Sequence, residues 1–405
     1  ASESATISSI INDAGPLTSS TGAQVWQITV RDGGAAPDGD SLPTIITALT
    51  IGRGTSSVVP SFATTILAAD LFDGTTNVGS AVIAANSLTF AGLNISTPDD
   101  GTKTLSLRIS LKTSGLVDNQ AFQFDLASAG VTTAGAVTSS QVASFAAIAS
   151  DQTKNKIDVV ATKLAFGTQP VNTGTGQPMM TAPTVYAADV NGNTDLDYAT
   201  NIDVTATGSV LTGSPVSVAP GAGTGTATFT GLTFTTAANG VTLTAVSGAL
   251  ANATSGTFNV VLIPLPGEIV INQISPDYNG GSNEYVEIVN LTNKTFDLSL
   301  LRLEYQSSTG SGGSAGGLLS GTLQPYSFWL LSPDATITAG QTVALPRDGS
   351  ITVGFAGAAG QIALRLASAP NTKIDGVGYG TLTGGTFVEG TAAVSPPTDG
   401  GIARI

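Results

Sequence analysis

Cysteine and histidine are both absent from the 405 residues of this chain. Without cysteine there is no disulfide, no thiolate nucleophile and no cysteine-ligated zinc or iron–sulfur cluster. Without histidine there is no Ser-His-Asp triad and no imidazole base. Catalysis would have to rest on carboxylates, lysine or tyrosine, and no motif arranges such groups for chemistry. The sequence therefore predicts that the protein is not an enzyme and that it carries no organic cofactor.

Charged residues are also scarce, at 10% of the chain against about 25% in ordinary globular proteins. The net charge of −14 disfavours nucleic acid as a partner, because phosphates are bound mainly by lysine and arginine. No apolar run reaches the ~18 residues that span a bilayer. The longest candidate, VVLIPLPGEIVI, is interrupted by Pro264 and Pro266. We expect neither a nucleic-acid partner nor a membrane span.

Alternation of apolar and polar residues runs through most of the chain. In TKTLSLRISLKT, the apolar residues Leu105, Leu107, Ile109 and Leu111 alternate with polar ones, as in a strand with one buried face. The segments VWQITV, AFQFDL and NIDVTA repeat this pattern, and Gly, Asn and Pro punctuate it about every ten residues. A hydrophobic content of 41% argues against disorder. The pattern predicts an all-β chain of sandwich domains.

An internal echo helps to divide the chain. FAGLNISTPDDG begins at Phe90 and FTGLTFTTAANG begins at Phe229, with the same spacing from Phe to the later Gly. Chance likeness between Thr-rich strands would also produce such an echo, but the spacing favours two related sandwiches. We expect domains at residues 1–160, 161–263 and 267–405, joined by short stiff segments into a semi-rigid rod.

The last third of the chain resembles the lamin-tail domain family, an immunoglobulin-like sandwich. The resemblance rests on EIVINQI, NEYVEIVNLTNKTFDLSLLRLEY, FWLL and KIDGVGYG, which follow one another from residue 268. The family usually has Asn-Glu in its first strand, where this chain has Asn272 and Gln273. The resemblance implies the fold of this domain and not a catalytic role.

Two further resemblances concern the remaining domains. ATKLAFGTQPVNT, VYAADVNGNTD and ATFTGLTFTTAANGVTLTAVSG are similar to a bacterial immunoglobulin-like repeat. VWQITVRDGGAAPDGDSLPTIITALTI and KTLSLRISLKTSGLVDNQAFQFDL are similar to a repeat of large secreted bacterial proteins. Such modules accompany adhesion and structural roles, which implies an extracellular, cell-surface location. The first residue, Ala1, fits a processed secreted protein and equally fits a fragment.

The segment DVNGNTDLD, residues 189–197, is the densest group of oxygen donors in the chain, and we call it the acidic loop. Calcium binds six to eight oxygens, often from Asp, Asn and backbone carbonyls. The alternating side chains would supply such ligands, although the spacing is not that of an EF-hand. Asn-Gly is equally a strong hairpin-turn signal, so a plain turn is the alternative. The predicted ligands are Asp189, Asn191, Asn193, Asp195 and Asp197.

Three weaker motifs complete the candidates. Asp40, Ser41 and Leu42 match a short O-glycosylation pattern, which makes Ser41 a predicted modification site. The loop RDGGAAPDGD holds three aspartates and is either a polar loop or a second metal site. Gly-x-Ser-x-Gly at Ser314 matches a nucleophile elbow by accident, since the chain has no histidine base.

Two functions fit these observations. The first is an extracellular structural protein of the bacterial surface that self-associates into a filament, sheath or layer. A surface of hydroxyls and small side chains favours this, because burying ions at an interface is costly. The second is an adhesin that binds glycan or protein through its sandwich loops. The lamin-tail pattern also stops early at Ile405, so we expect either that the rest was cleaved or not observed, or that a neighbouring molecule completes the sheet edge.

Overall fold

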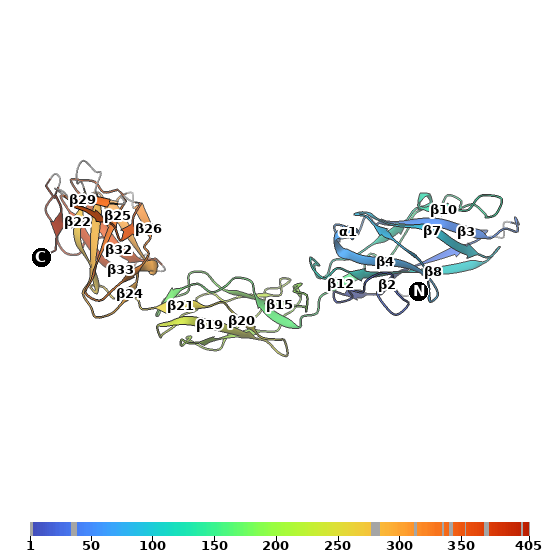
Figure 1. The fold of residues 1–405 in the computed structure, drawn as a ribbon, viewed down its shortest axis with the longest axis horizontal. Helices are drawn as coiled ribbons and strands as arrows, with labels where there is room; N and C mark the ends of the chain where they lie inside the picture. Colours follow the sequence, from blue (N-terminus) through green and yellow to red (C-terminus); the bar gives the residue numbers. More distant parts are fainter. Residues whose placement is uncertain are drawn as a thin grey trace.

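Three β-sandwiches follow one another end to end in the computed structural model of the chain (Figure 1). The structure describes residues 3–33, 39–276, 284–311, 314–333, 336–339, 343–352, 354–367, 372–397 and 400–404. Each sandwich encloses its own hydrophobic core, whose members run from Ile7 to Val159, from Leu164 to Val260 and from Ile269 to Tyr379. We call these units the first, second and third sandwich.

The first sandwich consists of a four-stranded and a six-stranded sheet. The four-stranded sheet has the order β2 (Ala23–Arg31), β8 (Thr102–Leu111), β4 (Ile66–Asp73) and β5 (Thr76–Ser80). The other has the order β11 (Ile148–Ala149), β9 (Phe124–Leu126), β3 (Thr44–Arg53), β7 (Ser87–Thr97) and β6 (Val82–Ile83), and β10 (Val131–Thr133) also pairs with β3. A parallel pair of β1 (Thr6–Ser8) and β12 (Lys156–Asp158), the helix α1 (Phe62–Thr65) and the 3-10 turn η1 (Ser128–Gly130) complete it.

The second sandwich is smaller. One sheet has the order β13 (Lys163–Phe166), β15 (Thr184–Ala188) and β18 (Thr226–Thr228). The other has the order β14 (Thr173–Gly174), β21 (Phe258–Val261), β19 (Ala238–Val246), β16 (Ile202–Thr207) and β17 (Val216–Val218), with β20 (Ala253–Thr254) on β19. Strand β15 faces the first sandwich and β21 leads to the third (Figure 1).

The third sandwich pairs a five-stranded and a four-stranded sheet. The first has the order β31 (Gly349–Ser350), β28 (Phe328–Ser332), β23 (Tyr285–Asn290), β22 (Ile269–Ser275) and β34 (Ile402–Ala403). The second has the order β26 (Ser314–Leu318), β25 (Leu301–Ser307), β32 (Gly360–Leu366) and β33 (Lys373–Tyr379). The pairs β24 (Phe296–Asp297) with β27 (Thr322–Leu323) and β29 (Thr336–Ala339) with β30 (Val343–Pro346), and the 3-10 turn η2 (Leu298–Leu300), lie at its margins.

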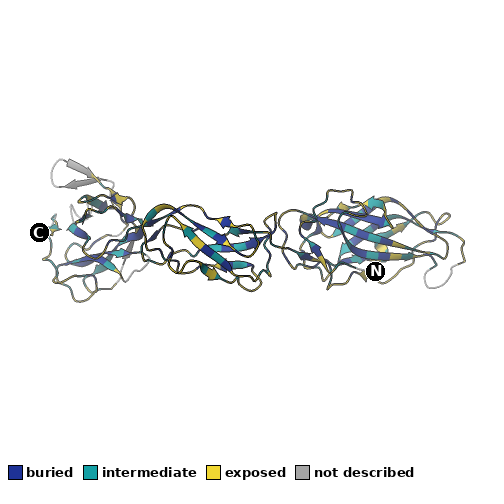
Figure 2. Cartoon of the chain, turned by 90° about the horizontal axis from the view of Figure 1, so that it is seen from below, coloured by how far each residue is buried: buried dark blue, intermediate teal, exposed yellow. Residues whose placement is uncertain are grey.

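The alternation in the sequence accounts for the way the strands pack. All four apolar residues predicted for the buried face of β8 are at most 1% exposed, and Figure 2 shows such buried strands inside each sandwich. In β2 the period breaks, because a bulge between Gln24 and Trp26 turns both Val25 and Trp26 into the core. The prediction of an all-β chain of tandem immunoglobulin-like sandwiches is confirmed.

The Phe-x-Gly-Leu echo occupies comparable places in the first two sandwiches. Phe90 and Phe229 are both buried, in β7 and directly after β18 respectively. In each case the next long strand, β8 or β19, belongs to the opposite sheet. The shared spacing therefore marks a crossing from one sheet to the other around a buried aromatic ring.

No helix in the described part of the chain is long and apolar enough to cross a membrane.

Candidate functional site

The acidic loop connects β15 to β16 and begins with a closed turn. The backbone N–H of Asp189 donates to the carbonyl of Asn193 at 3.0 Å, and that of Gly192 donates to the carbonyl of Asp189 at 3.1 Å. Gly192 has a φ of +94°, which glycine adopts without strain. The Asp189 carboxylate accepts the N–H groups of Asn191 and Asn193, both at 2.9 Å. The first half of the loop is thus a self-contained turn.

Asp189 is completely buried and reaches beyond its own domain. Its second carboxylate oxygen accepts the Ser9 hydroxyl of the first sandwich at 2.6 Å and the Asn193 amide at 3.0 Å. Burial raises the pKa of Asp189, but the donors from Asn193 and Ser9 outweigh it, and the net pKa lies below the ordinary value. The carboxylate stays charged and serves as an anchor between two domains.

The two amides of the loop extend this contact to other parts of the first sandwich. Asn191 donates to the side chain of Asn12 at 3.0 Å, and Asn193 donates to the carbonyl of Thr113 at 3.1 Å. The backbone N–H of Leu116 donates in turn to the Asn193 oxygen at 3.3 Å. Two separate segments of the first sandwich, at residues 9–12 and 113–116, therefore bind this one loop.

Asp118, in the loop between β8 and β9, ties the first sandwich to the segment that follows it. One carboxylate oxygen accepts the N–H of Val159 at 2.9 Å, and the other accepts the N–H of Leu196 at 3.0 Å. Asn119 donates to both oxygens, through its backbone and its side chain, at 3.0 Å. Asp118 is 3% exposed. Burial raises its pKa, and nearby Asp197 adds to the rise despite the donors.

Asp118, Asp195 and Asp197 bring three carboxylates together, with one oxygen from each lying within 4.8 Å of the others. Asp195 is 6% exposed, and one of its oxygens accepts the N–H of Ala161 at 2.9 Å. Its other oxygen is buried and has no hydrogen-bond partner in the described part of the chain. Burial raises the pKa of Asp195, and the N–H of Ala161 lowers it; the adjoining Asp197 carboxyl, through its side-chain contact and its charge, and the charge of Asp118 make the net shift upward.

The structure thus divides the five ligands predicted from sequence. Asp189, Asn191 and Asn193 are engaged in the turn and in contacts with the first sandwich. Asp195 and Asp197 instead join a carboxylate from the preceding domain, which sequence reasoning missed. Asp118 lies 77 residues from Asp195 in the chain, inside an ordinary loop, and no local pattern connects the two.

The weaker candidates have simpler surroundings. Ser41 is exposed, with a φ of +58°, and lies beside Asp40, whose carboxylate accepts the Ser140 hydroxyl at 2.8 Å. Asp32 is buried and accepts the Thr44 hydroxyl and the N–H of Asp100. A carboxylate oxygen of Asp32 lies within 4.8 Å of oxygens from Asp99 and Asp100, whereas Asp38 lies outside the described residues. The side chain of Ser314 also lies outside them.

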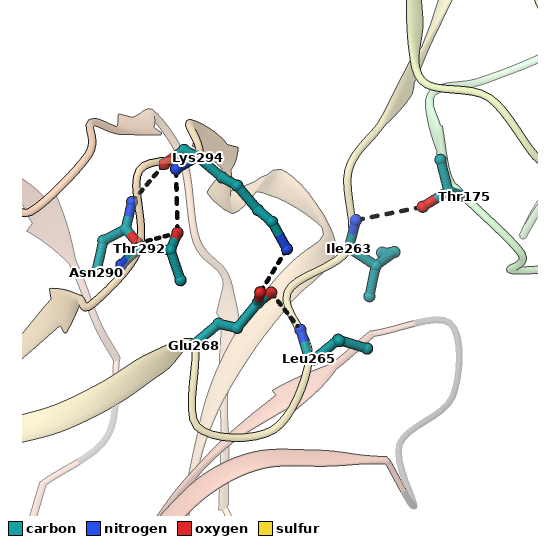
Figure 3. Close-up of polar contacts among 7 residues, drawn as sticks. All are labelled: Thr175, Ile263, Leu265, Glu268, Asn290, Thr292 and Lys294. Carbon is teal, nitrogen blue, oxygen red and sulfur yellow. Dashed lines mark hydrogen bonds and ion pairs between the residues drawn. The ribbon is translucent and has the colours of Figure 1, made fainter.

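Among the described residues, the junction between the second and the third sandwich has fewer direct bonds of this kind and is shown in Figure 3. The N–H of Ile263 donates to the Thr175 hydroxyl at 3.5 Å, a weak bond across the two domains. Ile263 also packs on the core of the third sandwich, and a Cβ added at Gly174 would lie 2.1 Å from its side chain. Glu268 accepts the N–H of Leu265 at 2.9 Å and forms an ion pair with Lys294. The proline-rich segment is therefore fixed to the third sandwich.

Comparison with known proteins bears chiefly on the third sandwich. The model of the Lamin Tail Domain family matches residues 264–381, which confirms the resemblance of this part of the chain. No curated protein matches the chain. The resemblances of the first two sandwiches to bacterial repeats stay predictions.

Three solved structures are similar to parts of this chain at low sequence identity. The BSP domain of a biofilm associated protein is 10% identical with a TM-score of 0.18, covering 84% of this chain and 60% of that one. A multidomain segment of titin is 8% identical with a TM-score of 0.19, covering 84% and 92%. The 47-kilodalton lipoprotein of Treponema pallidum is 8% identical with a TM-score of 0.19, covering 87% and 90%. The chain spans less than two thirds of the first of these, and likenesses of this size say nothing about function.

Proposed function

We propose that this chain is a non-enzymatic structural protein of the bacterial cell surface, a stiff rod that associates with other copies into a filament, sheath or layer. The observation that carries the proposal is the first junction. There the acidic loop is bonded to the first sandwich through Ser9, Asn12, Thr113 and Asp118. Contacts to two separate segments, at residues 9–12 and 113–118, fix an angle, whereas a single flexible tether would not.

The connecting segment itself leaves little freedom. The N–H of Val159 is bonded to Asp118, that of Ala161 to Asp195, and that of Thr162 to the carbonyl of Ala188. Backbone groups on both sides of Val160 are therefore held. Since loops that move have few such bonds, we expect the first two sandwiches to behave as one body.

The composition of the surface supports association between rods. Only 10% of the residues are charged, so most contacts would bury hydroxyls and methyl groups and avoid much of the cost of desolvating ions. Val82, Val137 and Val394 are 74%, 88% and 81% exposed and lie on the outside of the first and third sandwiches. The absence of cysteine means that such an assembly would rely on packing and strand pairing.

Negative-stain electron microscopy of the purified chain, with small-angle scattering of the dilute protein, tests the proposal. We expect scattering from an elongated particle at low concentration and ordered fibres or sheets as the concentration rises. A compact or widely bending particle would contradict the stiff rod. Separate short rods at all concentrations would contradict the assembly.

A cavity in the first sandwich favours a second candidate function, that of an adhesin. Its volume is about 590 Å3, and its walls include Ile28, Val30, Ile46, Leu105 and Phe145. This volume lies within the range of small-ligand sites, about 300–1,000 Å3. If the rods stay separate, the chain should be retained on an array of cell-surface glycans and proteins. Val30→Trp, which fills the cavity, should then reduce retention, and equal retention would contradict a role for the cavity.

A further inference from the structure

The carboxylates of Asp118, Asp195 and Asp197 form a group that the fold alone does not explain. Asp118 and Asp195 are 3% and 6% exposed, and Asp197 lies at the surface beside them. Like charges at this separation repel one another, and repulsion grows as water is excluded. The charged groups that most affect Asp195 are Asp197 and Asp118 themselves. The three carboxylates therefore destabilise one another when all of them are charged.

The free oxygen of Asp195 gives an independent indication. It is buried and has no hydrogen-bond partner among the residues that the structure describes, while the other oxygen accepts the N–H of Ala161. A buried polar atom without a partner costs about 1–3 kcal/mol, and more when it is charged. Folded proteins rarely retain such an atom unless an ion or an ordered water satisfies it.

We propose that Asp118, Asp195 and Asp197 bind a calcium ion that links the first sandwich to the second. The donors are all carboxylate oxygens, and the chain has no histidine or cysteine to favour zinc. With Ca–O distances of 2.3–2.6 Å, oxygens up to about 5 Å apart can share one Ca2+, against about 4 Å for Mg2+. One oxygen from each carboxylate lies within 4.8 Å of the others, so small shifts of the side chains would bring all three to a single Ca2+.

Asp118 can accept the ion at small cost. Its backbone donors, Val159 and Leu196, hold the carboxylate in place from both sides. The side-chain amide of Asn119 also occupies one oxygen, but Asn119 is exposed and its amide can turn to water. The ion replaces that amide, and water completes its coordination on the side of Asp197.

This ligand set differs from the five residues predicted from sequence, and the difference is measurable. The site would bind calcium whether or not the rods assemble, so its test is separate from that of the proposed function. The three relevant variants are Asp197→Asn, which removes an exposed ligand; Asn191→Ala, which removes a ligand of the sequence-based set only; and Asp203→Asn, a control on β16 of the same domain.

Isothermal titration of the chelator-treated full chain with CaCl2, repeated with MgCl2, tests the site. We expect one calcium per chain, weaker binding of magnesium, and a loss of about tenfold or more in calcium affinity for Asp197→Asn. Asn191→Ala and Asp203→Asn should stay within about twofold of the parent chain. An absence of calcium binding by the parent chain would overturn the proposal, as would parental affinity in Asp197→Asn. A loss confined to Asn191→Ala would return the site to the alternating set. Unchanged far-ultraviolet circular dichroism of each variant shows that the comparison concerns folded protein.

Discussion

Removal of the Asp189 carboxylate should weaken the contact between the first two sandwiches. The carboxylate accepts four donors, from the Ser9 hydroxyl, the Asn193 amide and the two N–H groups of Asn191 and Asn193. A hydrogen bond to a charged group contributes about 1.5–3 kcal/mol, and donors left unsatisfied in the interior add to the loss. The contributions overlap, because the same turn holds several of the donors. We expect Asp189→Ala to lower local stability by about 3–5 kcal/mol.

Hydrogen exchange followed by mass spectrometry measures this loss where it occurs. Peptides that cover the acidic loop and the segment around Ser9 should both lose protection in Asp189→Ala, because the bond between them joins the two domains. Ser9→Ala removes only that bond and should cost about 1–2 kcal/mol. Asn191→Ala is a matched control, since its side chain is exposed and should change protection by less than about 1 kcal/mol.

Repeating the hydrogen-exchange measurement with calcium and with chelator shows whether Asp189 anchors the turn or binds a metal ion. If Asp189 anchors the turn, the protection that Asp189→Ala loses relative to the parent chain should be the same in chelator as in calcium. A loss that appears only when calcium is present would show that Asp189 is a ligand and would refute our reasoning. A loss below about 1 kcal/mol in both conditions would refute the anchor itself.

Three further predictions concern the rest of the chain. Phe124→Ala should lower the unfolding free energy of the first sandwich by about 3–5 kcal/mol, seen by calorimetry, because its buried ring packs on two other phenylalanines at 5.3 and 5.9 Å. Glu268 has a pKa that burial raises but that the donors from Lys294 and the backbone bring below the ordinary value. Its stabilising contribution should therefore be complete above the unfolded pKa of about 4.3 and be lost as the pH falls through the lower folded pKa. Urea unfolding of the parent chain and of Glu268→Gln should converge in that range, and parallel profiles would contradict the assignment. Gly225→Ala should cost more than about 2 kcal/mol in thermal unfolding, because φ is +57° and the new Cβ would lie 1.8 Å from a carbonyl oxygen of the acidic loop. Gly223→Ala has a φ of +69° with open space and should cost less, so equal losses would contradict the clash.

The alternation of apolar and polar residues was enough to predict the fold, because every second residue of a sandwich strand is buried. The buried face of β8 could be predicted residue by residue, since Leu105 and Ile109 lie on a regular strand. The face of β2 could not, because a bulge brings neighbouring Val25 and Trp26 into the core, and a bulge depends on the partner strand. The lamin-tail pattern succeeded for the same reason as β8, since its quoted segments are mostly core strands.

The acidic loop shows why the site was harder to predict than the fold. Its nine residues contain both a turn and two of the three clustered carboxylates, so one short sequence pattern is consistent with a turn and with a metal site. Backbone donors decide between them: the N–H groups of Asn191 and Asn193 lie within reach of Asp189 and capture it for the turn. Asp195 lies beyond that turn, where one of its carboxylate oxygens lies within 4.8 Å of an oxygen of Asp118 from another domain. A sequence pattern detects only residues that are close together along the chain, whereas Asp118 meets Asp195 and Asp197 only when the two sandwiches pack against each other. Binding of a cation there would therefore depend on the packing of the two domains and not on the acidic loop alone.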